Sequence, residues 1–288
     1  MDKHTGQWRL GYQLRPWLQT WGRDILTERL AEVMATVAGL GYTGFETQLA
    51  CLPLDDPTAF HKASSRANGI AVCGAHTGGR WGDPNAASRI PELIERVGKL
   101  PDLGCGTLVV SMGLAPDAED DEVERAVACL RLLGRLCREE AGVRVAFHNH
   151  GRELADNARL LRAILEGCPS NDMSLGVDLG WVAHAGWDPV EFLGQFGDRV
   201  SYLHVRDITG NASAAGFTEV GRGTLDYRGI LAALGEIGYT GWLVAESELG
   251  ERWRGANNPE ETARRQLTGL RSASGAMVRP AESSQPIA

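Results

Sequence analysis

Short apolar runs alternate with longer amphipathic stretches along most of the chain. The apolar runs are typical of buried strands, and we predict strands at 8–14, 44–48, 71–76, 107–111, 144–148, 174–178, 200–204 and 241–246. They recur roughly 30 to 40 residues apart, which is the length of one strand–helix–strand crossover. Eight parallel units of this kind predict an α/β fold, a closed (βα)8 TIM barrel forming a single domain.

The stretches between the runs have the spacing of helices. Residues 25–41 place apolar residues three and four positions apart and end at a glycine. Residues 121–142 begin with acids and carry bases toward their end, an order that the helix dipole favours. Both stretches therefore predict helices.

An open doubly wound sheet is the alternative architecture. It would need a GxGxxG turn after the first strand, which the sequence lacks. A six-stranded sheet would also leave two of the eight predicted strand–helix units unexplained. The glycine-rich segment 221–226 leads into a helix without the full fingerprint, so it is weak evidence for a phosphate site. We predict a barrel over 1–272 and a flexible tail over 273–288, which is rich in Ser, Pro and Ala.

Charge and composition exclude some classes of function. The net charge is −8 and no run of Lys and Arg occurs, which argues against a nucleic-acid partner. No apolar segment resembles a signal or a membrane span, so we expect a cytoplasmic protein that does not bind membranes. The cysteines form no CxxC pair, and we expect them to be core residues in a reducing compartment: Cys51, Cys73, Cys105, Cys129, Cys137 and Cys168.

Asp178, His204 and Glu246 each end a predicted strand. The carboxyl ends of parallel barrel strands open onto one face, so these side chains are expected to converge there. Carboxylates and imidazole together are ligands that Mn²⁺, Mg²⁺, Co²⁺ or Zn²⁺ accepts. The structural alternatives are a helix cap or salt bridge for Asp178 and a backbone-bonded core imidazole for His204. Their shared position at strand ends favours a metal site.

The segment HNHGRE leaves the fourth ligand open between two residues. His148 and His150 share one face of the predicted strand, whereas Glu153 would reach back from the loop. We give His148 and Glu153 equal weight as metal ligands. Glu248, two residues after Glu246, is expected to support it or to contact solvent.

Other polar and aromatic residues at strand ends are candidates for substrate contact. Glu46 and His76 end predicted strands, and Trp181 follows Asp178 closely. Polar groups suit a hydroxylated ligand, and an indole suits stacking on a sugar or cyclitol ring; local structural bonding is the alternative for each. The loop 250–260, with Arg252, Trp253 and Arg254, could form a lid or contact a phosphate.

Five motifs in order resemble the xylose isomerase-like TIM barrels, specifically the sugar phosphate isomerase/epimerase and inosose dehydratase group. They are VAFHNHGRE, GVDLGWVAHAGWDP, YLHVRD, VGRGTLDYRGI and GYTGWLVAESE. The resemblance implies that Asp178, His204 and Glu246 bind a divalent metal, manganese first, with Co²⁺, Mg²⁺ or Zn²⁺ as alternatives; one branch of relatives has a glutamate that matches Glu153. It also implies that a homodimer is a possible state.

The chain departs from the family pattern at three positions. His148 stands where many relatives have glutamate, and Trp181 stands where epimerases and dehydratases often have histidine. Arg206 occupies the place of the lysine in HxKD. The first departure places in doubt the usual pair of glutamate acid/bases, because only Glu246 is in its expected register.

The resemblance implies an isomerase or epimerase that acts on a keto sugar or cyclitol through a metal-stabilised enediolate. An inosose dehydratase-like lyase is the alternative enzyme, and an abasic-site nuclease and a catalytically silent sugar- or partner-binding barrel are kept as further hypotheses. The catalytic candidates are Glu246, Glu153 and His148. The candidates for substrate binding are His76, His150, Trp181, Arg206 and Glu46.

Overall fold

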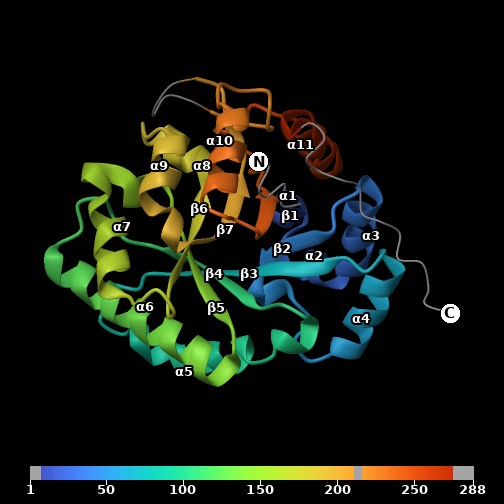
Figure 1. Ribbon diagram of the computed structural model, residues 1–288. Helices are drawn as coiled ribbons and strands as arrows, with labels where there is room; N and C mark the ends of the chain where they lie inside the picture. Colours follow the sequence, from blue (N-terminus) through green and yellow to red (C-terminus); the bar gives the residue numbers. More distant parts are fainter. Residues whose placement is uncertain (1–7, 211–215, 275–288) are drawn as a thin grey trace.

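The computed structural model describes residues 8–210 and 216–274 (Figure 1). Eight parallel strands close into a barrel in the order β1-β10-β7-β6-β5-β4-β3-β2. Their bounds are β1 Arg9–Gln13, β2 Gly44–Gln48, β3 Ala71–Gly79, β4 Thr107–Met112, β5 Arg144–His148, β6 Ser174–Asp178, β7 Val200–Val205 and β10 Trp242–Ala245. This confirms the predicted (βα)8 barrel.

Helices surround the barrel and connect its strands (Figure 1). They are α1 Arg15–Trp21, α2 Arg23–Glu28, α3 Leu30–Leu40, α4 Pro57–Arg66, α5 Ile90–Val97, α6 Asp120–Ala141, α7 Ala155–Gly167, α8 Leu179–His184, α9 Pro189–Phe196, α10 Tyr227–Glu236 and α11 Pro259–Ser274. Short 3₁₀ turns are η1 Leu49–Cys51, η2 Ala86–Arg89, η3 Pro101–Leu103, η4 Gly151–Leu154 and η5 Gly197–Arg199.

Two details differ from the sequence prediction. The helix expected over 25–41 is two helices, α2 and α3, because the backbone leaves the helical region at Arg29 (φ −101°, ψ 15°), whose guanidinium lies over Trp21. A small antiparallel pair, β8 Asp207–Ile208 and β9 Phe217–Thr218, lies outside the barrel after β7. Both features depend on contacts that the periodicity of the sequence does not contain.

The barrel is buried on both faces of its strands, as expected for a parallel sheet. A large apolar core fills the space between the strands and the helices. Inside the barrel, a smaller cluster consists of Cys73, Val109, Ala146, Tyr202 and Val244. All six cysteines are buried and free, which confirms that they pack as core residues.

The register of the strands aligns their carboxyl ends. Asp178 lies opposite His204 across β6 and β7, and His148 lies opposite Ser111 across β5 and β4. The N–H of Glu246 donates to the Val205 carbonyl at 3.0 Å, which continues the pairing of β10 with β7. Residues from four strand ends are thereby brought to one end of the barrel.

The predicted tail over 273–288 lies outside the described residues from 275 onward, while 273 and 274 belong to α11. Among the helices of the described ranges, none combines the length and the apolar character needed to cross a membrane.

Candidate metal centre

Four buried side chains meet at the carboxyl ends of the strands: His148, Asp178, His204 and Glu246. One potential ligand atom from each lies within 4.8 Å of the other three. Metal–ligand bonds of about 2.1 Å would place opposite ligands about 4.2 Å apart, so a small contraction would complete a coordination shell. The cluster could therefore hold a divalent metal.

The hydrogen-bond inventory of the described residues supports this fit. His148 Nδ1, His204 Nδ1 and Glu246 Oε2 are buried and have no hydrogen-bond partner. His204 Nδ1 and Glu246 Oε2 lie 2.8 Å apart without the alignment of a hydrogen bond. Buried polar atoms that lack partners are unfavourable, and a cation coordinated by all three would satisfy them. The residues present fit a metal ion.

Asp178 is held by its neighbours along the chain and across the barrel. Its Oδ1 accepts the Trp181 N–H at 2.9 Å and so caps α8. Its own N–H donates to Asn149 Oδ1 at 3.0 Å, so the middle residue of HNH ties the end of β5 to the end of β6. Arg206 Nη2 donates to Oδ2 and Arg206 Nε donates to Oδ1 at 3.3 Å, so Oδ2 is the oxygen that keeps a second lone pair for a cation.

The charges of the cluster are set by burial and by the surrounding cations. Burial raises the pKa of Asp178 to about 6, although Arg206 opposes that rise. Burial would also raise the pKa of Glu246, but Arg206 and His204 outweigh it and hold that pKa well below its ordinary value. Glu246 is therefore ionised, as a metal ligand must be.

The two imidazoles of the cluster differ. Burial, with His204 close by, lowers the pKa of His148 well below its ordinary value, which leaves this ring neutral. Burial would likewise lower the pKa of His204, but the carboxylates of Glu46 and Glu246 raise it well above the ordinary value. A cation that binds His204 Nδ1 must displace a proton there, so metal affinity is expected to rise with pH.

Glu153 lies outside this cluster. Its Oε2 accepts the backbone N–H of His150 at 2.7 Å, which closes a capping box at the start of η4. Burial raises the pKa of Glu153 to about 7. Between the two candidates for the fourth ligand, the structure brings His148 to the cluster. Glu153 Oε2 is used by the local turn, whereas its Oε1 is buried without a hydrogen-bond partner among the described residues, so the expectation that Glu153 reaches the metal stays a prediction.

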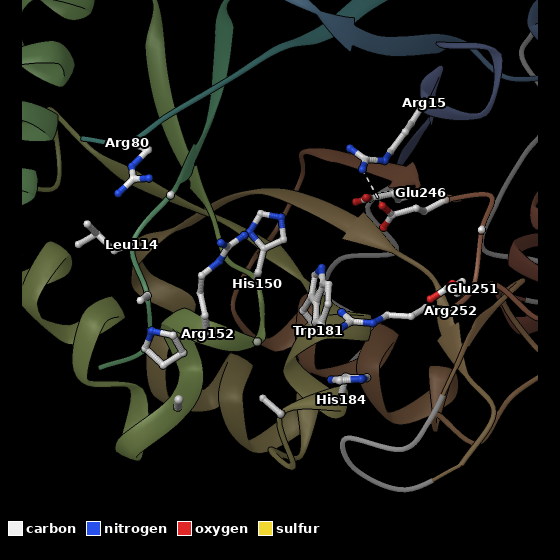
Figure 2. Close-up of a pocket in the computed structure, with 18 of the residues that line it drawn as sticks. Arg15, Arg80, Leu114, His150, Arg152, Trp181, His184, Glu246, Glu251 and Arg252 are labelled. Carbon is white, nitrogen blue, oxygen red and sulfur yellow. Dashed lines mark hydrogen bonds and ion pairs between the residues drawn. The ribbon is translucent and has the colours of Figure 1, made fainter. Parts of the chain in front are cut away.

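A cavity of about 1240 Å³ opens at this end of the barrel, and Glu246 joins it to the cluster. Figure 2 shows Trp181 in the cavity with His150 on one side and Arg252 on the other. The predicted substrate contacts His150 and Trp181 both line this cavity. A neutral His150 faces it, because burial lowers the pKa of that ring to about 3.

Three other predicted substrate contacts do not line the cavity. Glu46 and Arg206 are fully buried, and His76 lies beside a separate small pocket. The carboxylate of Glu46 is occupied by other side chains of the barrel interior, and Arg206 packs over the Phe217 ring at 3.9 Å. Position near a strand end suggested Glu46 and His76, and the family resemblance suggested Arg206; as substrate contacts all three stay predictions.

Sequence analysis missed several arginines at the mouth. Arg15, Arg80 and Arg152 line the cavity together with Arg252 (Figure 2). Arg15 Nη2 forms an ion pair of 2.6 Å with Glu248 Oε1, which links the loop after β10 to the start of α1. Arg15 begins α1, Arg80 follows β3 and Arg152 lies in η4, so they share no periodic pattern, and no signal in the sequence distinguishes them from other surface arginines.

The chain was compared with known proteins. The model of the xylose isomerase-like TIM barrel family matches residues 34–273. An inosose dehydratase from Geobacillus kaustophilus (strain HTA426) is 28% identical over 251 residues, which cover 75% of this chain and 79% of that protein. An inosose dehydratase from Lacticaseibacillus casei is 30% identical over 149 residues, about half of each protein (46% and 49%).

Solved structures show the same fold at low identity. A 3-keto-D-glucoside 4-epimerase from E. coli superposes with a TM-score of 0.72 at 19% identity, covering 92% of this chain and 100% of that one. A D-allulose 3-epimerase from Methylomonas sp. also gives 0.72, at 17% identity, covering 93% and 98%. The closed barrel and the family match over 34–273 lead to one assignment: the chain belongs to the xylose isomerase-like TIM barrel family.

Proposed function

We propose that this protein is a divalent-metal-dependent enzyme that removes a proton from the carbon next to the carbonyl of a keto sugar or cyclitol. The observation that carries the proposal is the cluster of His148, Asp178, His204 and Glu246, which Glu246 joins to the cavity. The family assignment and the names of the relatives support a small polyhydroxylated substrate.

A bound divalent metal would supply positive charge that stabilises the enediolate oxygens of the substrate. Two imidazoles and two carboxylates suit Mn²⁺, the ion we propose first, and Co²⁺ or Zn²⁺ next; Mg²⁺ prefers an all-oxygen shell. His148 and His204 would hold the metal from β5 and β7, and Asp178 and Glu246 from the ends of β6 and β10.

The chain's own residues supply the proton transfer and the orientation. Glu246 is ionised, buried and at the cavity floor, so its carboxylate is the proton acceptor. Trp181 offers an indole face against which a ring can stack, and the neutral His150 can hydrogen-bond a hydroxyl. Their positions around the cavity would fix the carbon to be deprotonated above Glu246.

The deprotonated substrate could be isomerised, epimerised or dehydrated. The sequence favours isomerisation or epimerisation first and loss of water second. Epimerisation needs a second proton-transfer group on the opposite face of the carbon, and Glu153, the second glutamate expected, is outside the cluster. A single glutamate suffices for elimination, because Glu246 can pass the proton it takes to the leaving hydroxyl.

We therefore favour a lyase that expels water from a keto sugar or cyclitol, with isomerisation through the same proton transfer as the second candidate. The inosose dehydratase relatives support this order. A cytoplasmic location and a homodimer stay predictions.

The proposal is tested with metal-loaded protein, inosose and a set of ketoses in D₂O. Exchange of the substrate's carbon-bound hydrogen for deuterium reports the first step, and ultraviolet absorbance of the unsaturated product reports loss of water. Exchange without new absorbance would indicate an isomerase or epimerase. No exchange with any of these substrates would argue for the silent barrel, and cleavage of an abasic DNA duplex would indicate the nuclease.

A further inference from the structure

A buried carboxylate, that of Glu46, lies behind the His204 ring. Glu46 lies on β2, and its side chain is fully buried. His204 Nε2 is 2.7 Å from Glu46 Oε2, while His204 Nδ1 faces Glu246 Oε2 at 2.8 Å. One nitrogen of the ring thus faces the interior of the barrel, and the other faces the ligand cluster.

The other partners of Glu46 decide which nitrogen carries the proton. Tyr202 Oη donates to Glu46 Oε2 at 2.7 Å, and Gln13 Nε2 donates to Glu46 Oε1 at 3.0 Å. A carboxylate that receives two donors in this way acts as an acceptor, so the contact with His204 requires a proton on Nε2. In the neutral ring, the free lone pair then lies on Nδ1, on the side of the cluster.

We propose that Glu46 is a positioning residue for the metal centre, which holds the Nε2 proton and the ring plane of His204 so that Nδ1 coordinates the cation. The inference rests on the metal centre of the proposed function. A negative acceptor behind a ligating imidazole also makes the ring a stronger ligand. Glu46 therefore acts through His204, and the substrate contact expected for it from the sequence is replaced by this role.

The test is the affinity of the purified full chain for Co²⁺, together with the visible absorption of the bound ion. Glu46→Gln keeps the volume but removes the charge, and its amide can donate to Nε2 and so stabilise the wrong tautomer. We expect Co²⁺ affinity to fall roughly 10- to 100-fold, with a changed absorption spectrum, the range found for partners of metal ligands.

Glu219→Gln is the matched control. Glu219 is also fully buried, but its carboxylate accepts from Thr218 Oγ1 and the Ala256 N–H, neither of which belongs to the ligand cluster. We expect this variant to bind Co²⁺ within about twofold of the wild type, with an unchanged spectrum, since no ligand contact is altered. Equal losses in both variants, or no loss in Glu46→Gln, would overturn the role of Glu46.

The wild-type protein provides a second measurement, which does not depend on the folding of a variant. In the Zn²⁺-loaded protein, ¹⁵N chemical shifts of His204 should show a protonated Nε2 and a metal-bound Nδ1. The opposite assignment would refute the positioning role while leaving the metal centre intact. A wild-type chain that binds neither Co²⁺ nor Zn²⁺ would instead refute the metal centre, and with it this inference.

Discussion

Arg206 Nη2 lies 2.5 Å from Asp178 Oδ2, and neither side chain is exposed to solvent. The other terminal nitrogen, Nη1, lies 3.6 Å from Glu246 Oε1 and has no hydrogen-bond partner in the described part of the chain. Because burial makes unpaired carboxylates unfavourable, this guanidinium offsets the desolvation of two acids at once. Arg206 therefore stabilises two buried carboxylates of the candidate metal centre.

We expect Arg206→Met to lower the free energy of unfolding by about 3–5 kcal/mol, because Asp178 would remain buried without its cation. Urea unfolding measured at pH 7 checks this. Arg264→Met is the control: Arg264 pairs with Glu260 at 2.7 Å on the surface, and its loss should change stability by less than about 1 kcal/mol. Similar effects from both substitutions would contradict the structural role of Arg206.

Glu246→Gln should keep the fold and reduce solvent exchange of the substrate hydrogen by about 10²- to 10⁴-fold, because the amide cannot accept the proton. Deuterium uptake by mass spectrometry measures this. Glu236→Gln changes an exposed glutamate of α10 that does not line the cavity and should alter the rate by less than about threefold, since surface changes away from the reacting atoms are mild. A variant at 246 with ordinary exchange would exclude Glu246 as the base.

If His148 is the fourth metal ligand and Glu153 is not, variants at these two positions should differ in metal affinity. His148→Ala should weaken Mn²⁺ binding by at least about tenfold, since even partners of ligands have effects of that size. Glu153→Gln should leave the affinity nearly unchanged, because its carboxylate contacts the His150 N–H instead of the cluster. Isothermal titration of both variants decides the question, and the reverse pattern would restore Glu153 as the ligand.

The buried Glu153 predicts a dependence of stability on pH. Burial raises its pKa from 4.5 to about 7, so the folded chain holds this proton more tightly than the unfolded chain does. The associated stability is present below pH 4.5 and is lost as the pH rises through about 7, an effect of about 3 kcal/mol at most.

Glu153→Gln removes this titration, and the groups common to both proteins cancel when the variant is compared with the wild type. The free energy of unfolding of the wild type relative to the variant should therefore fall between pH 4.5 and 7. A difference that is flat over this range would show that Glu153 titrates normally in the fold.

Metal content provides a further check. We expect about one divalent ion per chain after purification, because one set of four ligands is present in the described residues. Removal by chelation should lower the melting temperature, and adding Mn²⁺ should restore it, since a ligand that binds the folded state stabilises it. Less than about 0.1 equivalent of metal, with no uptake on addition, would favour the silent barrel.

The order and type of the barrel strands follow from local sequence. Runs such as 174–178 and 200–204 are mostly apolar, because parallel strands are buried on both faces, and a charged or imidazole residue at the end of such a run marks the mouth. That rule predicts from the sequence alone that Asp178, His204 and Glu246 lie together. The family motifs added the expectation of a metal.

The tertiary structure alone decided how the remaining polar residues are used. Glu46 and His204 are 158 positions apart, and no local pattern predicts that their side chains share a hydrogen bond. The roles of His148 and Glu153 likewise depend on the turn after β5, where a capping contact competes with metal ligation. Periodicity records which face of a strand is buried, whereas the partner of a buried polar atom depends on strand register and on closure of the barrel.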